Sequence, residues 1–142
     1  MNVAFDRVQR QPSAIFLKLA QRQVEEFMSS VVGINSVVLA TGDGFEMVKV
    51  TNQANLDSGK VAAVSSSILS MVQAFTSEIK LVNCQSLILD ADNGKAIIAG
   101  VPCSQYPMVL VVLANEKVLL GQVLHGMRLC AKHLVDNSTK FD

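Results

Sequence analysis

Residues 86–101 read SLILDADNGKAIIAGV and contain the pattern that decides the fold. The apolar runs LIL (87–89) and AII (96–98) lie on either side of Asn93 and Gly94. Asn-Gly between apolar runs is the strongest short-range signal for a β-hairpin, because its tight turn needs backbone angles that Asn and Gly adopt at little cost. The sequence therefore predicts two antiparallel strands, over residues 86–90 and 95–101.

Three further strands follow from similar patterns. Residues 108–114, MVLVVLA, are apolar without alternation, which is typical of a buried central strand. Residues 34–41 have the same character, although a short buried helix fits that pattern too. Gly42-Asp43-Gly44 predicts a tight turn, and residues 45–50 are mixed in polarity, as an edge strand would be.

Helical spacing of apolar residues predicts three helices, over residues 13–32, 58–80 and from about 115 to 135. Ser13 can cap the first helix and Gly33 can end it, and Asp57 or Ser58 can cap the second. The order helix, two strands, helix, three strands, helix predicts an α+β fold with one five-stranded antiparallel sheet. We expect one domain over 13–135, a loosely ordered N-terminus (1–12) and a frayed tail (136–142).

The composition limits the classes of partner. Half of the 142 residues are hydrophobic and only 17% are charged, so a partner is expected to cover part of the apolar surface. Lys plus Arg equals Asp plus Glu at 12 each, which argues against binding to nucleic acid. The sequence has neither a polybasic patch nor a long uninterrupted apolar run, so no membrane contact is expected.

The second helix has two distinctive faces. No charged residue occurs from Val61 to Ser77, and a stripe of large apolar residues is predicted to pack on the sheet. The opposite face carries small uncharged residues, which would let a helix of another chain approach closely. An exposed serine-rich face, or cover by another part of this chain, is the alternative. The large stripe is Val61, Val64, Ile68, Met71, Val72, Phe75 and Ile79, and the small one is Ala63, Ser67, Ser70 and Ala74.

No catalytic constellation is visible, so we expect neither an enzyme nor a bound metal or cofactor. Phosphate-loop and nucleophile-elbow motifs are absent. The three cysteines, Cys84, Cys103 and Cys130, have no metal-ligand spacing, and their odd number indicates a reducing compartment, here the cytoplasm. The N-terminus does not resemble a signal peptide. A thiol-dependent enzyme that uses Cys103 is a minor alternative.

The order of elements, with certain short segments, resembles the roadblock (dynein light chain) family, which includes MglB-like regulators. The matching segments are VGINSVVL (32–39), TGDGF (41–45), the 87–98 hairpin, MVLVVL (108–113) and LLGQV (119–123). The resemblance covers residues 13–135 and implies a roadblock/profilin-like sandwich.

The resemblance also implies a dimer, of this chain with itself or with a paralogue, that binds and controls a Ras-like small GTPase. Such regulators can accelerate GTP hydrolysis without donating a catalytic side chain. A small-molecule-sensing profilin-like domain is the alternative function. The implied dimer interface is Ala63, Ser67, Ser70, Ala74, Leu87, Ile88 and Leu89, and further candidate contacts with the partner are Ala62, Ser66, Leu69, Gln73 and Ser77.

Overall fold

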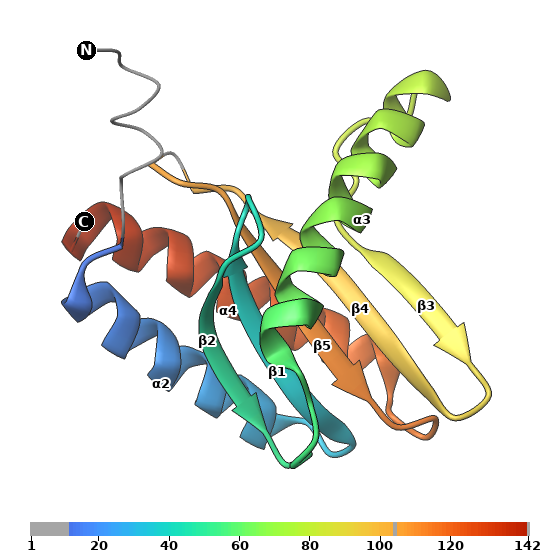
Figure 1. The fold of residues 1–142 in the computed structure, drawn as a ribbon, viewed down its shortest axis with the longest axis horizontal. Helices are drawn as coiled ribbons and strands as arrows, with labels where there is room; N and C mark the ends of the chain where they lie inside the picture. The colour runs from blue at the N-terminus through green and yellow to red at the C-terminus, as the bar shows by residue number, and fades with distance from the viewer. Residues whose placement is uncertain (1–11, 104, 142) are drawn as a thin grey trace.

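The computed structural model describes residues 12–103 and 105–141. Along these residues the elements follow the order helix, two strands, helix, three strands, helix, which confirms the predicted fold class (Figure 1). The elements are α2 (Ala14–Ser30), β1 (Ile34–Thr41), β2 (Glu46–Thr51), α3 (Ser58–Glu78), β3 (Leu87–Ala91), β4 (Gly94–Val101), β5 (Met108–Ala114) and α4 (Leu120–Phe141).

The five strands form one antiparallel sheet in the spatial order β2-β1-β5-β4-β3. β5 is central and almost wholly buried, and β2 lies at one edge, as predicted. β1 is a buried inner strand, so the alternative of a short helix over residues 34–41 is excluded. The β3–β4 turn brings Ala91 opposite Gly94. A Cβ added to Gly94 would stand 2.8 Å from the Ala114 carbonyl oxygen. Only glycine fits at this position.

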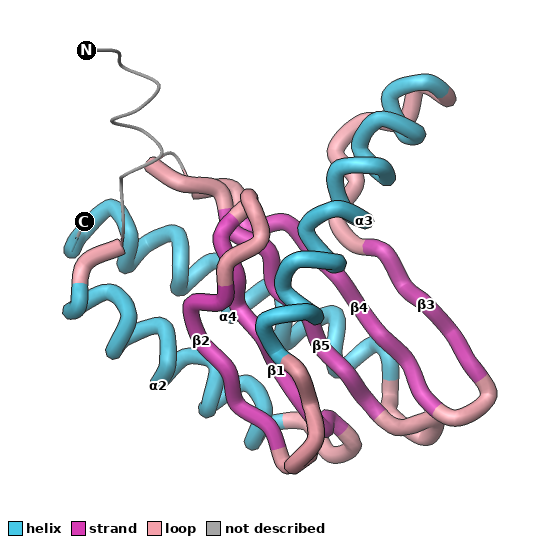
Figure 2. Tube along the Cα trace, viewed as in Figure 1, coloured by secondary structure: helices cyan, strands magenta, loops and turns pink. Residues whose placement is uncertain are grey.

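Helices α2 and α4 cover one face of the sheet, and α3 crosses the other (Figures 1 and 2). The larger core lies between the sheet and the α2/α4 pair. Ser13 caps α2 by accepting a hydrogen bond from the Phe16 backbone N–H at 3.0 Å. The apolar spacing of α2 correctly predicted which residues face this core: Phe16, Ala20, Val24 and Phe27 are all buried.

The last helix extends further than the sequence analysis placed it. α4 continues to Phe141, through residues expected to form a frayed tail. Ser138 is fully buried, accepts a hydrogen bond from the Cys103 thiol at 3.0 Å and donates one to the Val135 carbonyl at 2.7 Å. A contact with the loop after β4 therefore holds the last turns in place. The expectation for residues 1–11 lies outside the described residues.

The face of α3 that packs on the sheet is only partly the predicted one: Val61 and Ile68 are half-buried against the strands, but the fully buried positions are different. Its buried residues are Ser58, Ala62, Ser65 and Ser66, whereas Phe75 is 62% exposed. The first half of α3 lies very close to the strands, and its most deeply buried side chains are small, with Val61 and Ile68 packing beside them. The β1–β2 turn shows how close: a Cβ on Gly44 would stand 3.2 Å from the Cα of the helix residue Ala63. The rest of α3 projects past the strands, and the chain returns to β3 through residues 79–86 (Figure 1).

Candidate interaction surface and edge cleft

Large exposed apolar side chains gather along α3 and β3. Large apolar side chains left in water are candidate contacts with a partner. We call this set the α3–β3 surface. Its members are Val64, Met71, Phe75, Ile79, Leu81, Val82, Ile88 and Leu89. Ile88 is opposite Ile97 of the larger core and so lies on the α4 side of β3.

The small-residue stripe of α3 lies at this surface. Ala63, Ser67, Ser70 and Ala74 are all exposed, and the Ser67 hydroxyl bonds only to the Ala63 carbonyl of its own helix, at 3.3 Å. These side chains are thus free to meet another chain. A second helix can approach closely where the side chains between the two backbones are small.

β3 is the outer strand at the other edge of the sheet. Leu87 is half-buried, and Ile88 and Leu89 are exposed. An edge strand presents backbone N–H and C=O groups that a further strand can pair with. Helix α3 and strand β3 are neighbours in the fold, joined by the loop of residues 79–86 (Figure 1).

Two of the five candidate partner-contact residues already contact their own chain. Ala62 is fully buried against strands β1, β4 and β5, and the Ser66 hydroxyl donates a hydrogen bond to the Gly42 carbonyl. Their side chains hold α3 on the sheet. Leu69 is half-buried, and Gln73 and Ser77 are exposed.

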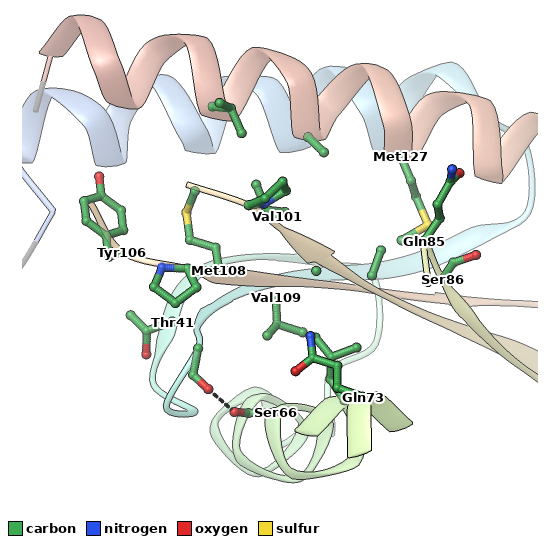
Figure 3. A pocket seen from close by; sticks show the side chains of 18 of the residues that line it. Thr41, Ser66, Gln73, Gln85, Ser86, Val101, Tyr106, Met108, Val109 and Met127 are labelled. Atoms are coloured by element: carbon green, nitrogen blue, oxygen red, sulfur yellow. Dashed lines mark hydrogen bonds between the residues drawn. The ribbon is translucent and has the colours of Figure 1, made fainter. Parts of the chain in front are cut away.

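A cleft of about 1870 Å³ opens where β4 continues beyond β3 (Figure 3). The β3–β4 pairing ends at Leu87 opposite Ile98, so residues 99–101 of β4 pair only with β5. We call this opening the edge cleft. α3 lies on one side of it, with Ser66 and Gln73, and α4 lies on the other, with Met127 (Figure 3).

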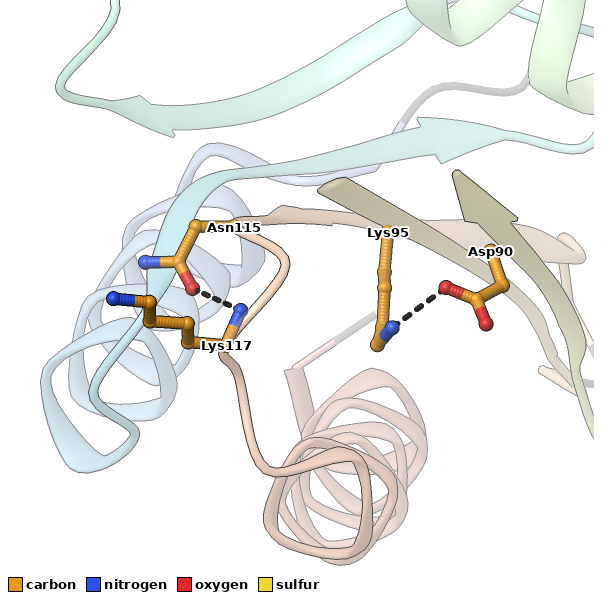
Figure 4. Close-up of polar contacts among 4 residues, drawn as sticks. All are labelled: Asp90, Lys95, Asn115 and Lys117. Carbon is orange, nitrogen blue, oxygen red and sulfur yellow. Dashed lines mark hydrogen bonds and ion pairs between the residues drawn. The ribbon is translucent and has the colours of Figure 1, made fainter. Parts of the chain in front are cut away.

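Polar contacts mark the far end of the β3–β4 hairpin (Figure 4). The Lys95 ammonium donates to the Asp90 carboxylate at 2.6 Å. Because the Asp90 side chain is 71% exposed, solvent screens this pair and it contributes little to stability. Nearby, the Asn115 side chain accepts from the Lys117 backbone N–H at 2.9 Å in the turn before α4.

Two of the three thiols are buried. Burial raises the pKa of the Cys130 thiol from 9.0 to about 12, so it stays protonated at neutral pH. Cys103 is also buried, and Cys84 is exposed. In the described part of the chain, no group of three or more His, Cys, Asp or Glu side chains is placed to hold a metal ion. The described helices also include none long and apolar enough to cross a membrane.

Similarity to known proteins is found in structure and not in sequence. No family model and no curated protein sequence matches the chain. An MglB structure with a tetrameric arrangement superposes with a TM-score of 0.81 at 15% identity, covering 94% of this chain and all of that one. Gliding protein MglB from Thermus thermophilus gives 0.79 at 14% identity, with 92% and 99% covered. A roadblock/LC7 domain from Streptomyces avermitilis gives 0.72 at 16% identity, with 80% and 92% covered.

The chain has the roadblock fold. The sandwich predicted from the resemblance is thereby confirmed, although the identities are too low to transfer partners or activities.

Within this roadblock fold, sequence reasoning missed two features. It assigned Val64, Met71, Phe75 and Ile79 to the sheet, whereas all four are exposed. It also missed the edge cleft. One signal was present: the strand predicted before the hairpin turn (86–90) is shorter than the strand predicted after it (95–101), so one strand must end first.

Proposed function

We propose that the chain forms a homodimer through the α3–β3 surface, and that the dimer regulates or scaffolds a Ras-like small GTPase in the cytoplasm. The observation that carries the proposal is the exposed apolar side of α3, where Met71 is 64% and Phe75 is 62% exposed. Covering such side chains stabilises an assembly by about 25 cal/mol per Å² of apolar area removed from water. Pairing with a close paralogue would cover the same surface.

The geometry of the surface suits a symmetric dimer. In an isologous interface the same patch on both copies is self-complementary. Small residues such as Ser67 and Ser70 would let the two α3 helices approach, and the larger residues Met71 and Phe75 would pack beside them. The outer edge of β3 would then pair with the same strand of the second copy.

The regulatory part of the proposal is supported by the fold. Two of the superposed structures are MglB proteins, one of them named a gliding protein. The family resemblance of the sequence implies that such regulators act on a Ras-like GTPase. The dimer would act by binding and reshaping the GTPase, with no catalytic side chain of its own. Gln73 and Ser77 remain exposed beside the seam and are the candidate contacts with the GTPase.

Light scattering over a dilution series tests the dimer. The wild type is expected to show twice the 15.3 kDa mass of one chain, and Ser67→Arg is expected to be a monomer because a long charged side chain blocks the helix contact. Ser29→Arg is the matched control, since Ser29 is an exposed serine on α2, across the sheet. A monomeric wild type, or loss of the dimer in both variants, would contradict the proposed dimer interface.

Binding assays test the regulatory role separately. Ras-like GTPases from the same organism are titrated with the wild-type dimer, each loaded with GDP or a non-hydrolysable GTP analogue, and the rate of GTP hydrolysis is followed with and without the dimer. Binding in one nucleotide state is the expected result. Absence of binding to every such GTPase in both states would remove the proposed partner while leaving the dimer intact.

A further inference from the structure

The last residues of β4 have a neighbouring strand on one side only. Residues 99–101 pair with β5 on one side, and the hydrogen-bonded ladder with β3 stops at Ile98 on the other. Consecutive residues of an antiparallel strand direct their backbone groups alternately to the two neighbouring strands. At least one residue of 99–101 therefore directs its N–H and C=O into the edge cleft, away from β5. An extended segment is the natural partner of such groups.

The cleft has room for that segment. Gly100 is exposed, and a Cβ built on it would meet only the tip of Leu69, at 3.6 Å. On the other face of β4, the side chains of Met127, Ala131 and Val135 from α4 provide an apolar wall. Alternate side chains of an added strand point to opposite faces of the sheet. One set would meet Leu69, and the other would meet α4.

Two cations stand on the α4 wall. Arg128 and Lys132 are one turn apart, are exposed, and line the cleft. The ion pair found among the described residues joins Lys95 to Asp90, so neither cation has a carboxylate partner there. Asp136 follows one turn later and Asp43 lies on the α3 side, so the positive charge is confined to the stretch of α4 nearest Gln85 and Met127.

We propose that the edge cleft binds an extended acidic segment of a partner protein. Its backbone pairs with residues 99–101 of β4, its apolar side chains alternate between Leu69 and the α4 wall, and a carboxylate lies between Arg128 and Lys132. The N–H and C=O of a strand edge and the alternating apolar walls on its two faces suit an extended peptide. The site lies between α3 and α4, and Ser70 of the small stripe and Gln73 line its α3 side. Peptide binding is measured separately from the dimer and from the GTPase.

A displayed library of random linear peptides, selected on the wild-type protein, provides the probe. The most enriched peptide is synthesised with a fluorophore and titrated by anisotropy. We expect enrichment of sequences with alternating apolar residues and a Glu or Asp. We also expect the backbone amide resonances of residues 99–101 to shift on binding, in spectra of the full chain.

Matched charge reversals test the geometry. Arg128→Glu/Lys132→Glu is expected to weaken the peptide at least about tenfold, because a carboxylate would then face two others. Lys18→Glu/Arg22→Glu, on the exposed side of α2, carries the same change in charge and is expected to leave affinity unchanged. Thermal melts of both variants check that each is folded.

Several results would overturn the proposal. These are a library without enrichment, equal effects of the two double variants, and amide shifts that avoid residues 99–101. Peptide binding only after deletion of residues 1–11 would show that the chain fills its own cleft. Loss of the dimer in Arg128→Glu/Lys132→Glu would show that a second copy fills it. A failed GTPase assay has no bearing on any of these readouts.

Discussion

Helices α2 and α3 lie on opposite faces of one sheet and both carry regular apolar stripes, yet they use them differently. α2 buries its stripe, with Phe16 fully enclosed between the sheet and α4. α3 places its small residues against the sheet and leaves Met71 and Phe75 exposed. An apolar stripe in the sequence therefore shows which side of a helix is hydrophobic. It does not show whether that side packs within the same chain or against a partner.

The strongest test of this contrast removes one phenylalanine from each helix. Phe16→Ala is expected to lower the free energy of unfolding by about 3–5 kcal/mol, because it deletes a buried ring and leaves a cavity. Phe75→Ala is expected to change it by less than about 0.5 kcal/mol when measured on the monomer, because its ring is already in water. Urea unfolding at concentrations below the onset of self-association measures both.

Equal losses in the two variants would contradict the contrast, since α3 would then be packed within its own chain. A loss for Phe75→Ala that appears only at high concentration would instead support the dimer.

Two glycines of α4 test how closely α2 and α4 pack on this face of the sheet. A Cβ at Gly126 would stand 2.5 Å from the Phe27 ring, where α2 and α4 cross, whereas a Cβ at Gly121 would meet nothing within 4 Å. Gly126→Ala is expected to cost about 1–3 kcal/mol through overpacking. Gly121→Ala is expected to gain up to about 1 kcal/mol, because alanine favours the helix.

The same urea titrations decide this pair, and each variant serves as the control for the other. Equal shifts in the same direction would mean that helix propensity alone acts and that α2 and α4 do not meet closely at Gly126.

Near pH 9.0 the smallest effect is expected, and it also arises on the packed face. Burial raises the pKa of Cys130 to about 12, above its unfolded value of 9.0. The folded thiol keeps a proton that the unfolded one loses between these two values. Stability from this group is therefore complete below the unfolded pKa and falls as pH rises, by up to about 1.4 kcal/mol per pH unit.

Cys130→Ala removes this titration, so the difference in unfolding free energy between the wild type and the variant is expected to narrow above pH 9.0. Unfolding curves at several pH values provide the measurement. A difference that stays constant up to about pH 11 would contradict the burial of this thiol as the cause.

Local patterns were sufficient to predict most of the fold. Asn93-Gly94 between apolar runs predicted the hairpin, and the spacing of apolar residues in α2 predicted its buried side, because both depend on neighbours in the sequence. The end of α4 depends on a contact between Ser138 and Cys103, and no local pattern encodes it.

The candidate site was harder to predict for the same reason. The small stripe of α3 was found, but of the predicted sheet-facing residues only Val61 and Ile68 pack on the strands. Ala62 and Ser66 were missed, because they contact segments distant in the sequence. The edge cleft arises from where the β3–β4 ladder ends, which only the assembled sheet defines. An interaction surface thus consists of the apolar residues that the folded chain leaves exposed, and these are known only once the packing of the whole fold is known.

The attachment of α3 has a consequence for how the helix opens. Asp57 caps its first turn, Ser58 donates to Glu46, and Ser66 donates to the Gly42 carbonyl, so these side-chain ties to the rest of the chain lie in its first half. The free energy of local opening should therefore decrease along the helix, and amide hydrogens beyond about residue 70 should exchange with solvent first. A partner that covers Phe75 would slow that exchange, and part of its binding free energy would be used to order the far end of α3.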